Sequence, residues 1–316
     1  MATEEGVGAV RESEATRGQI PSALGRWLLG LELGAPCTAG RLEVVPLISK
    51  RDEGAPYLLL HEAMGRGLLQ VSEQRDGVVN EVLATNLGSD PLLVVEGETI
   101  LGAKQNRVVL MSMIIPGHTT VPVPVGCMEQ GRWTIGSQFS GVGEMPIEPE
   151  IRSQSMFERV KGGRFDQGRL WGTIAAKLSA AQVHSRTADY NEFMASHHKA
   201  AKERARALEP VPGQVGIMAL LNGKLVALEL LGHPVNWASI AARLTSSYML
   251  GLFGDAARGT TGRLTAQDWL ELIAKGSVIS RHGVGQGEQI ILQGPGYAGA
   301  GVWDGHRPAH LAVFAR

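Results

Sequence analysis

Residues 214–231, QVGIMALLNGKLVALELL, consist of two apolar runs joined by Asn222-Gly223. The dipeptide Asn-Gly readily takes the positive φ angles of a type I′ turn, whose twist matches that of two antiparallel strands. Each run has the length and the aliphatic composition of a strand. This stretch therefore predicts a β-hairpin and, with it, an antiparallel sheet in the C-terminal part of the chain.

The residues after this hairpin combine helices with more strands. VNWASIAARLTSSYML (235–250) has apolar residues at helical spacing, and TAQDWLELIAKG (265–276) begins at a threonine cap and ends at a glycine. Four further runs, separated by glycines, have strand composition: SVISRHG, EQIILQG, GAGVWDG and PAHLAVFA. We therefore expect residues 210–316 to form an α+β domain.

The first half of the chain is rich in short β-type runs between Gly, Asn, Asp and Pro residues. Examples are RLEVVPLI, GLLQVSE, PLLVVEGE, RVVLMSMII and TTVPVPVG. They predict an antiparallel β-sandwich or barrel-like domain over residues 25–148. YLLLHEAM (57–64), which lies among these runs, is compatible with one helical turn or two.

Residues 149–209 change to a helix-forming composition that is rich in Ala, Glu, Lys, Arg and Gln. Leu170, Ile174 and Leu178 form an i, i+4 apolar stripe. A second helix is expected at about 188–208, with Asp189 at its start and basic residues in its last turn. The helical segment and the β-rich segments on either side of it predict an α+β fold. The acidic tail over residues 1–24 is expected to be disordered.

The balance of charges restricts the possible partners, and the cysteine content restricts the cellular compartment. The 316-residue chain has 30 Lys and Arg against 31 Asp and Glu, so no overall field would attract nucleic acid or an anionic membrane. Cys37 and Cys127 match no metal or redox spacing and favour a reduced cytoplasmic setting. No apolar run approaches the roughly 20 residues that span a bilayer. We expect neither a nucleic-acid partner nor a membrane, and the oligomeric state is left open.

Three generic motifs do not support a cofactor or a metal site. GDAARGTTGR (254–263) lacks the Lys-Ser/Thr pair of a phosphate loop, and GVGQGE (283–288) lacks the third glycine of a dinucleotide fingerprint. The histidines of HSRTADYNEFMASHH (184–198) have no ligand at i+4 on the predicted helix. These histidines are better explained as residues on solvent-exposed helix faces than as metal ligands.

Two polar clusters lie among the β-type runs of the first half. EGETILGAKQNRVVL (96–110) and GCMEQGRW (126–133) both mix acids, bases and amides. If residues 104–107 were a strand, Lys104 and Asn106 would point to one face, and Gln105 and Arg107 to the other. A hairpin between residues 107–115 and 119–126 would place Arg107 near Cys127, so that the two clusters would meet at one end of a sheet.

These residue types suit a nucleotide-like ligand. Lys and Arg neutralise phosphates, amides orient polar groups, carboxylates bind ribose hydroxyls, and a Trp ring stacks on a base. The same residues would equally suit a buried network of Arg, Glu and amide groups that fixes a β-corner. From the residue types alone, both interpretations stand.

Several segments resemble a known family. GAKQNR, C-x-EQGRW, GRLWGTIAAKL and GIMALLNGKLVALELLGHPVNWASIAARLTSSYML are similar, in that order, to segments of the ARG and rhodanese-phosphatase-superfamily-associated protein family, where ARG stands for ADP-ribosylglycohydrolase. The resemblance covers residues 30–315 and implies no established activity. By analogy it suggests a role around ADP-ribose or other NAD-derived nucleotides.

The leading hypothesis is thus a cytoplasmic protein that binds such a ligand at the end of the β-rich domain. If the protein is an enzyme, Glu98 or Glu129 is the candidate general base toward water at a ribosyl or phosphoryl centre. The alternative is a protein-interaction or scaffold module without catalytic activity. Cys127 is interpreted as a core residue rather than a reactive thiol. The candidate ligand-binding residues are Lys104, Gln105, Asn106, Arg107, Gln130, Arg132 and Trp133.

Overall fold

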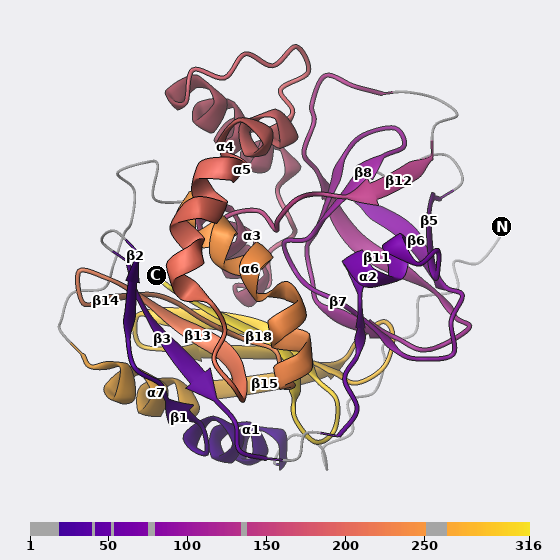
Figure 1. The fold of residues 1–316 in the computed structure, drawn as a ribbon. Helices are drawn as coiled ribbons and strands as arrows, with labels where there is room; N and C mark the ends of the chain where they lie inside the picture. Colours follow the sequence, from indigo (N-terminus) through magenta and orange to yellow (C-terminus); the bar gives the residue numbers. More distant parts are fainter. Residues whose placement is uncertain (1–18, 40–41, 52–53, 75–79, 134–137, 251–263) are drawn as a thin grey trace, which may run out of the picture.

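The computed structural model describes residues 19–39, 42–51, 54–74, 80–133, 138–250 and 264–316. These residues form an α+β fold, as the sequence predicted, with three β-sheets and helices on both faces of the largest one (Figure 1). The tail over residues 1–18 and the GDAARGTTGR motif lie outside the described residues. Residues 19–24 belong to a helix, α1 (Gln19–Leu29), so this part of the expected disordered tail is ordered.

The largest sheet has nine antiparallel strands and is built around the predicted hairpin. Asn222 and Gly223 have φ angles of 52° and 74°, as a type I′ turn requires. The strands run in the order β1-β3-β13-β14-β18-β17-β16-β15, with β2 paired to β3. Their bounds are β1 Glu32–Leu33, β2 Cys37–Ala39, β3 Leu42–Ile48, β13 Gln214–Leu221, β14 Lys224–Leu230, β15 Ser277–His282, β16 Glu288–Gly294, β17 Tyr297–Trp303 and β18 Pro308–Ala315.

This sheet combines strands from the N-terminal and the C-terminal parts of the described chain. β3 pairs along its whole length with β13. The sequence-based boundaries at residues 148 and 209 follow changes of composition, whereas the sheet combines strands from both sides of them. One face packs on α1 and α7 (Ala266–Ala274) through a core that includes Trp27, Val215 and Trp269. The other face packs on α6 (Pro234–Leu250) and on the helices of the middle segment.

The β-rich part contains two smaller sheets that share one apolar core with α2 (Leu60–Gly65). A six-stranded sheet has the order β12-β8-β9-β11-β6-β5, and a three-stranded sheet has the order β10-β7-β4. The bounds are β4 Leu58–Leu59, β5 Leu69–Glu73, β6 Glu81–Asn86, β7 Leu92–Val94, β8 Thr99–Gly102, β9 Arg107–Val109, β10 Met113–Ile115, β11 Thr120–Cys127 and β12 Phe139–Val142.

The hairpin predicted between residues 107–115 and 119–126 forms only in part. β9 pairs with β11 and places Arg107 opposite Cys127, as expected. β10 leaves this sheet and pairs with β7 instead. Its residues Met113 and Ile115 thereby enter the core between the two sheets, and the burial of these side chains favours the change of partner.

The middle segment is helical, as its composition predicted, and contains α3 (Pro149–Val160), α4 (Gln167–Ala180), α5 (Tyr190–Ala205) and the short 3₁₀ helix η1 (Arg206–Leu208). The sequence analysis named helices in the regions of α4 and α5 but not α3. Asp166 and Asp189 cap α4 and α5, each accepting a hydrogen bond from a backbone N–H of the first turn.

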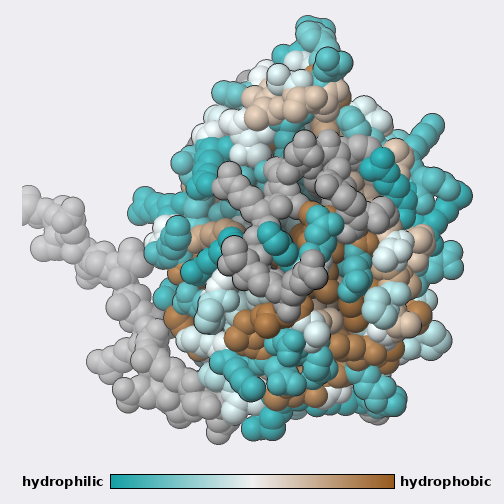
Figure 2. Space-filling model, turned by 90° about the vertical axis from the view of Figure 1, so that its left-hand side faces the viewer, coloured by the Kyte–Doolittle hydropathy of each residue, from teal (hydrophilic) through white to brown (hydrophobic). Residues whose placement is uncertain are grey.

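The upper part of the face in Figure 2 is mostly hydrophilic, and apolar residues gather lower down. Among the described helices, none has the length and apolar character needed to cross a membrane.

Candidate functional site

Residues 103–106 of the segment GAKQNR form a tight turn between β8 and β9 rather than a strand. Gly102 and Ala103 have φ angles of 110° and 49°, which reverse the chain. The predicted alternation of faces is therefore wrong, because two neighbouring side chains point the same way. The Gln105 amide donates to the carbonyl of Glu129 at 2.6 Å, and the Asn106 amide donates to the Asp189 carboxylate at 2.9 Å.

Arg132 joins the two polar clusters at this turn, so the prediction that they meet is confirmed. Its guanidinium donates to the Glu129 carboxylate at 2.6 Å, to the Ala103 carbonyl at 2.8 Å and to the Asn106 side-chain oxygen at 3.2 Å. Asp189 lies beside them, where burial, together with the charge of Glu129, raises its pKa to about 6. We call Asn106, Glu129, Arg132 and Asp189 the signature cluster.

Arg107 leaves this cluster and points to the other side of the turn. Its side chain is fully buried, forms an ion pair with Glu73 at 3.2 Å and donates to the sulfur of Cys127. Burial raises the pKa of the Cys127 thiol to about 11 even though Arg107 opposes this shift. Its deep burial agrees with the interpretation of Cys127 as a core residue.

Lys104, Gln130 and Trp133 form the more open part of the predicted ligand site. The Lys104 ammonium lies 4.9 Å from the centre of the Trp133 ring, and 48% of Trp133 is exposed. Gln130 is exposed as well. Lys104 and Trp133 thus form an open pair and Gln130 is an exposed amide, whereas the other four predicted ligand residues are held by groups of the protein itself. Their role in binding stays a prediction.

Glu98, one of the two predicted general bases, lies in a different place. It sits in the turn between β7 and β8, and its carboxylate is fully buried. One oxygen accepts from the Val95 N–H at 3.1 Å. The other lies 2.9 Å from a nitrogen of Arg243 on α6 and 4.0 Å from Nδ1 of His61 on α2.

His61 and Arg243 were missed by the sequence analysis, because neither belongs to a motif. Each is the only basic residue of a mainly apolar segment: His61 lies in YLLLHEAM, and Arg243 lies in VNWASIAARLTSSYML. A basic side chain among apolar core positions needs a buried polar or acidic partner. This requirement was the signal by which the sequence could have indicated both residues. The partner of both residues is Glu98, which no spacing rule connects with them.

His61 and Arg243 line a pocket of about 410 Å³ between α2, β12, α5 and α6. The side chain of Lys202, on α5, reaches its rim and pairs with Glu144 at 2.6 Å. Arg243 also donates to the Gly143 carbonyl at 2.9 Å, which fixes the backbone after β12. The lining residues are His61, Met64, Gly65, Ser140, Gly141, Val142, Gly143, Glu144, Lys202 and Arg243.

The His61 ring has a defined arrangement of partners. Nε2 lies 3.3 Å from the hydroxyl of Ser239, and this hydroxyl donates to the Glu62 carboxylate at 2.6 Å. Nδ1 is buried without a hydrogen-bond partner among the described residues. Burial, helped by the charge of Arg243, lowers the pKa of His61 below its usual value. The imidazole is therefore uncharged at neutral pH.

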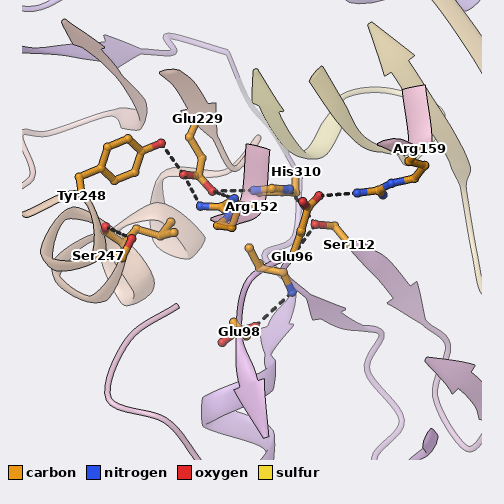
Figure 3. A network of polar contacts seen from close by, with 11 residues as sticks. Glu96, Glu98, Ser112, Arg152, Arg159, Glu229, Ser247, Tyr248 and His310 are labelled. Carbon is orange, nitrogen blue, oxygen red and sulfur yellow. Dashed lines mark hydrogen bonds and ion pairs between the residues drawn. The ribbon is translucent and has the colours of Figure 1, made fainter. Parts of the chain in front are cut away.

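A second polar network is fully buried at the junction of the large sheet, α3 and α6 (Figure 3). Arg152 binds Glu229 through two nitrogens at 2.5 and 3.0 Å, and Tyr248 and His310 donate to the same carboxylate. Burial alone would raise the pKa of Glu229, but Arg152 and His310 lower it to about 2. Because all four side chains are hidden from solvent, we interpret this network as structural.

This network also explains the position of Glu96. His310 lies 2.8 Å from the Ser112 hydroxyl, which accepts from the backbone N–H of Glu96. The Glu96 carboxylate pairs with Arg159 at 3.2 Å. Glu96 is thereby turned away from Glu98, although only Gly97 separates them. Within the described ranges, no group of three or more His, Cys, Asp or Glu side chains is arranged to hold a metal ion.

Comparison with known proteins identifies the class of the chain. Residues 30–314 match the ARPP-1 domain, described as the ARG and Rhodanese-Phosphatase-superfamily-associated Protein domain. The chain therefore belongs to this family, and the resemblance seen in the sequence is confirmed. Neither the curated proteins nor the solved structures gave a match.

Proposed function

We propose that this chain binds an ADP-ribose-like or other NAD-derived nucleotide in the pocket between α2, β12, α5 and α6. The observation that carries this proposal is the presence of Arg243 and Lys202 at one pocket whose floor is backed by the Glu98 carboxylate. A volume of about 410 Å³ is within the range of about 300–1,000 Å³ typical of small-molecule sites.

The charges around the pocket suit a ligand that has both phosphates and hydroxyl groups. Arg243 uses one N–H at each of its three nitrogens for Glu98, Gly143 and Glu144. A guanidinium has five N–H donors, so two remain for a phosphate. The ammonium of Lys202 is half-exposed and pairs with Glu144. Glu144 in turn offers an acceptor for a ribose hydroxyl.

The signature cluster supports this pocket from a distance. Asp189 caps the N-terminus of α5, and Asn106 holds the Asp189 carboxylate. Lys202 lies near the other end of the same helix, so the cluster fixes the helix that brings Lys202 to the pocket. Lys104 and Trp133 do not line this pocket, so Lys104→Ala serves as a comparison, and Arg132→Ala tests the contribution of the cluster.

The family name gives the proposal its ligand class. The name of the domain family associates it with ARG proteins, and ARG abbreviates ADP-ribosylglycohydrolase. By analogy, ligands with an ADP-ribosyl part are the first to test. An activity is not needed for this step, because a binding protein would require the same pocket.

Isothermal titration of ADP-ribose into the wild type and into two lysine variants tests the proposal. Lys202→Ala removes a cation at the pocket and should weaken binding by about tenfold, which corresponds to about 1.4 kcal/mol. Lys275→Ala is the matched control, since Lys275 also pairs with a glutamate on the surface but lies directly after α7, which does not contribute to the pocket. Equal affinity of both variants and the wild type would contradict this location. If neither ADP-ribose nor NAD nor AMP binds, the interaction-module hypothesis would replace it.

A further inference from the structure

We propose that His61 and Glu98 together form the base that activates a water molecule for cleavage of a ribosyl bond. This inference rests on the proposed function, because it places the chemistry in the same pocket. It goes further by naming the reaction class and by selecting Glu98, rather than Glu129, as the relevant carboxylate. His61 contributes a proton acceptor that the sequence motifs did not indicate.

The hydrogen bonds around Ser239 define which nitrogen of His61 carries the proton. The Ser239 hydroxyl donates its only hydrogen to Glu62 at 2.6 Å. Its oxygen must therefore accept from the N–H at Nε2 of His61, 3.3 Å away. A neutral imidazole has one N–H, so Nδ1 has a lone pair and acts as an acceptor.

Two acceptors consequently lie close together at the pocket: His61 belongs to its lining, and the buried Glu98 carboxylate lies behind His61. Nδ1 of His61 is buried without a hydrogen-bond partner in the described part of the chain, and it lies 4.0 Å from the nearer Glu98 oxygen. A molecule that donates two hydrogens matches this pair, and water is the smallest one. Both its protons would point at the acceptors, which leaves its lone pairs for attack on a bound ligand.

Charge favours a ribosyl carbon over a phosphorus atom as the centre attacked. Cleavage of a ribosyl bond passes through a transition state with positive charge at the anomeric carbon, which a nearby carboxylate stabilises. A phosphoryl group carries negative charge, which Glu98 would repel. The phosphates of the ligand would instead lie toward Lys202 and the N–H groups of Arg243 that Glu98, Gly143 and Glu144 do not use.

The step balances for a substrate with a pyridinium leaving group, such as NAD. The water oxygen forms a bond to the anomeric carbon while the carbon–nitrogen bond breaks. Its electron pair neutralises the pyridinium nitrogen, so that nicotinamide leaves without needing a proton. The proton of the water passes to His61 and then to solvent, and the products are ADP-ribose, nicotinamide and one proton.

Arg243 acts as a positioning residue in this arrangement. It holds the Glu98 oxygen that faces His61, at 2.9 Å. Burial and the Arg243 charge also keep His61 unprotonated at neutral pH. The pH profile of cleavage should accordingly be flat near pH 7 and fall below the usual histidine pKa of about 6.5.

The experiment measures nicotinamide release from NAD by chromatography, with NAD binding measured by titration on the same samples. His61→Gln and Glu98→Gln should each lower the rate at least about a hundredfold while NAD affinity changes less than threefold. His282→Gln on the exposed edge strand β15 is the matched control and should keep the wild-type rate. If Glu98→Gln fails to fold, as its melting curve would show, His61→Gln decides alone.

Different outcomes separate this inference from the proposed function. Binding of NAD without nicotinamide release overturns the inference and leaves the binding proposal intact. Wild-type rates in His61→Gln also overturn it. Release of AMP from ADP-ribose, a compound without a pyridinium leaving group, would show that phosphorus is attacked instead, which contradicts the reaction class. Absence of any nucleotide binding would overturn both.

Discussion

The guanidinium of Arg243 on α6 lies 2.9 Å from the buried carboxylate of Glu98, in the turn before β8. This ion pair connects the β-rich part of the chain with a helix that covers the large sheet. The pocket forms beside it, where Gly143 and Lys202 approach the same helix. Glu98 thus has two roles in our account: it anchors Arg243, and it faces His61.

Removal of Arg152 should strongly destabilise the fold. Arg152→Ala leaves the Glu229 carboxylate buried without its main partner, and breaking such a pair costs about 3–5 kcal/mol. Urea denaturation should show this loss as a lower midpoint. The double variant Arg152→Met/Glu229→Gln should recover part of it, because no charge is then left unpaired. A single variant as stable as the wild type would contradict the structural interpretation of this network.

Asp189 should make the protein less stable as the pH rises from about 4 to 6. Its pKa is about 6 in the fold against an ordinary value of 3.8, so the folded state binds a proton that the unfolded state has released. Stability falls over this range by up to about 3 kcal/mol and is constant above it. Urea midpoints measured between pH 4 and 7 should fall less steeply for Asp189→Asn. Parallel curves for both proteins would contradict this assignment.

Cys127 should be almost inert toward alkylation. A pKa of about 11 leaves very little thiolate at pH 8, so iodoacetamide should modify it at least about a hundredfold more slowly than a free thiol. Mass spectrometry of digested samples distinguishes Cys127 from Cys37, which is partly exposed and serves as the internal comparison. Rapid labelling of Cys127 in the folded protein would restore the reactive-thiol interpretation.

Two basic residues of the predicted ligand site should differ in their effect on stability. Arg132 binds Glu129, Ala103 and Asn106, so Arg132→Ala should cost about 2–3 kcal/mol. Lys104 contacts the exposed Trp133 ring, and Lys104→Ala should cost less than about 1 kcal/mol. Thermal unfolding of both variants checks this. Equal losses would show that Lys104 is also part of the buried network.

Local sequence signals were sufficient for much of the fold. The Asn222-Gly223 turn, the capped helix α5 and the meeting of the two polar clusters follow from residue types and spacing. The pairing of β10 with β7, rather than with β11, could not be predicted from the sequence. The partner of an apolar strand depends on which core the strand helps to fill. The junction of β3 with β13 likewise joins segments about 170 residues apart, beyond the reach of any local pattern.

Only part of the candidate site could be predicted from the sequence. Glu98 stood out because it lies in a dense polar cluster, but the structure separates it from that cluster and gives it His61 and Arg243 as neighbours. These neighbours come from the helices α2 and α6, and they meet Glu98 only through long-range packing. Residue type alone could not show that Arg107 would bind Glu73 and the Cys127 sulfur.

The location of ligand binding is the central claim, and thermal stability with ADP-ribose tests it most directly. A ligand at about a hundred times its dissociation constant stabilises the folded state by about 2.7 kcal/mol. Our account predicts this increase in the wild type and in Lys104→Ala, and a clearly smaller one in Lys202→Ala at the same concentration. Loss of the increase in Lys104→Ala with full retention in Lys202→Ala would contradict the account and place the ligand at the Lys104–Trp133 surface.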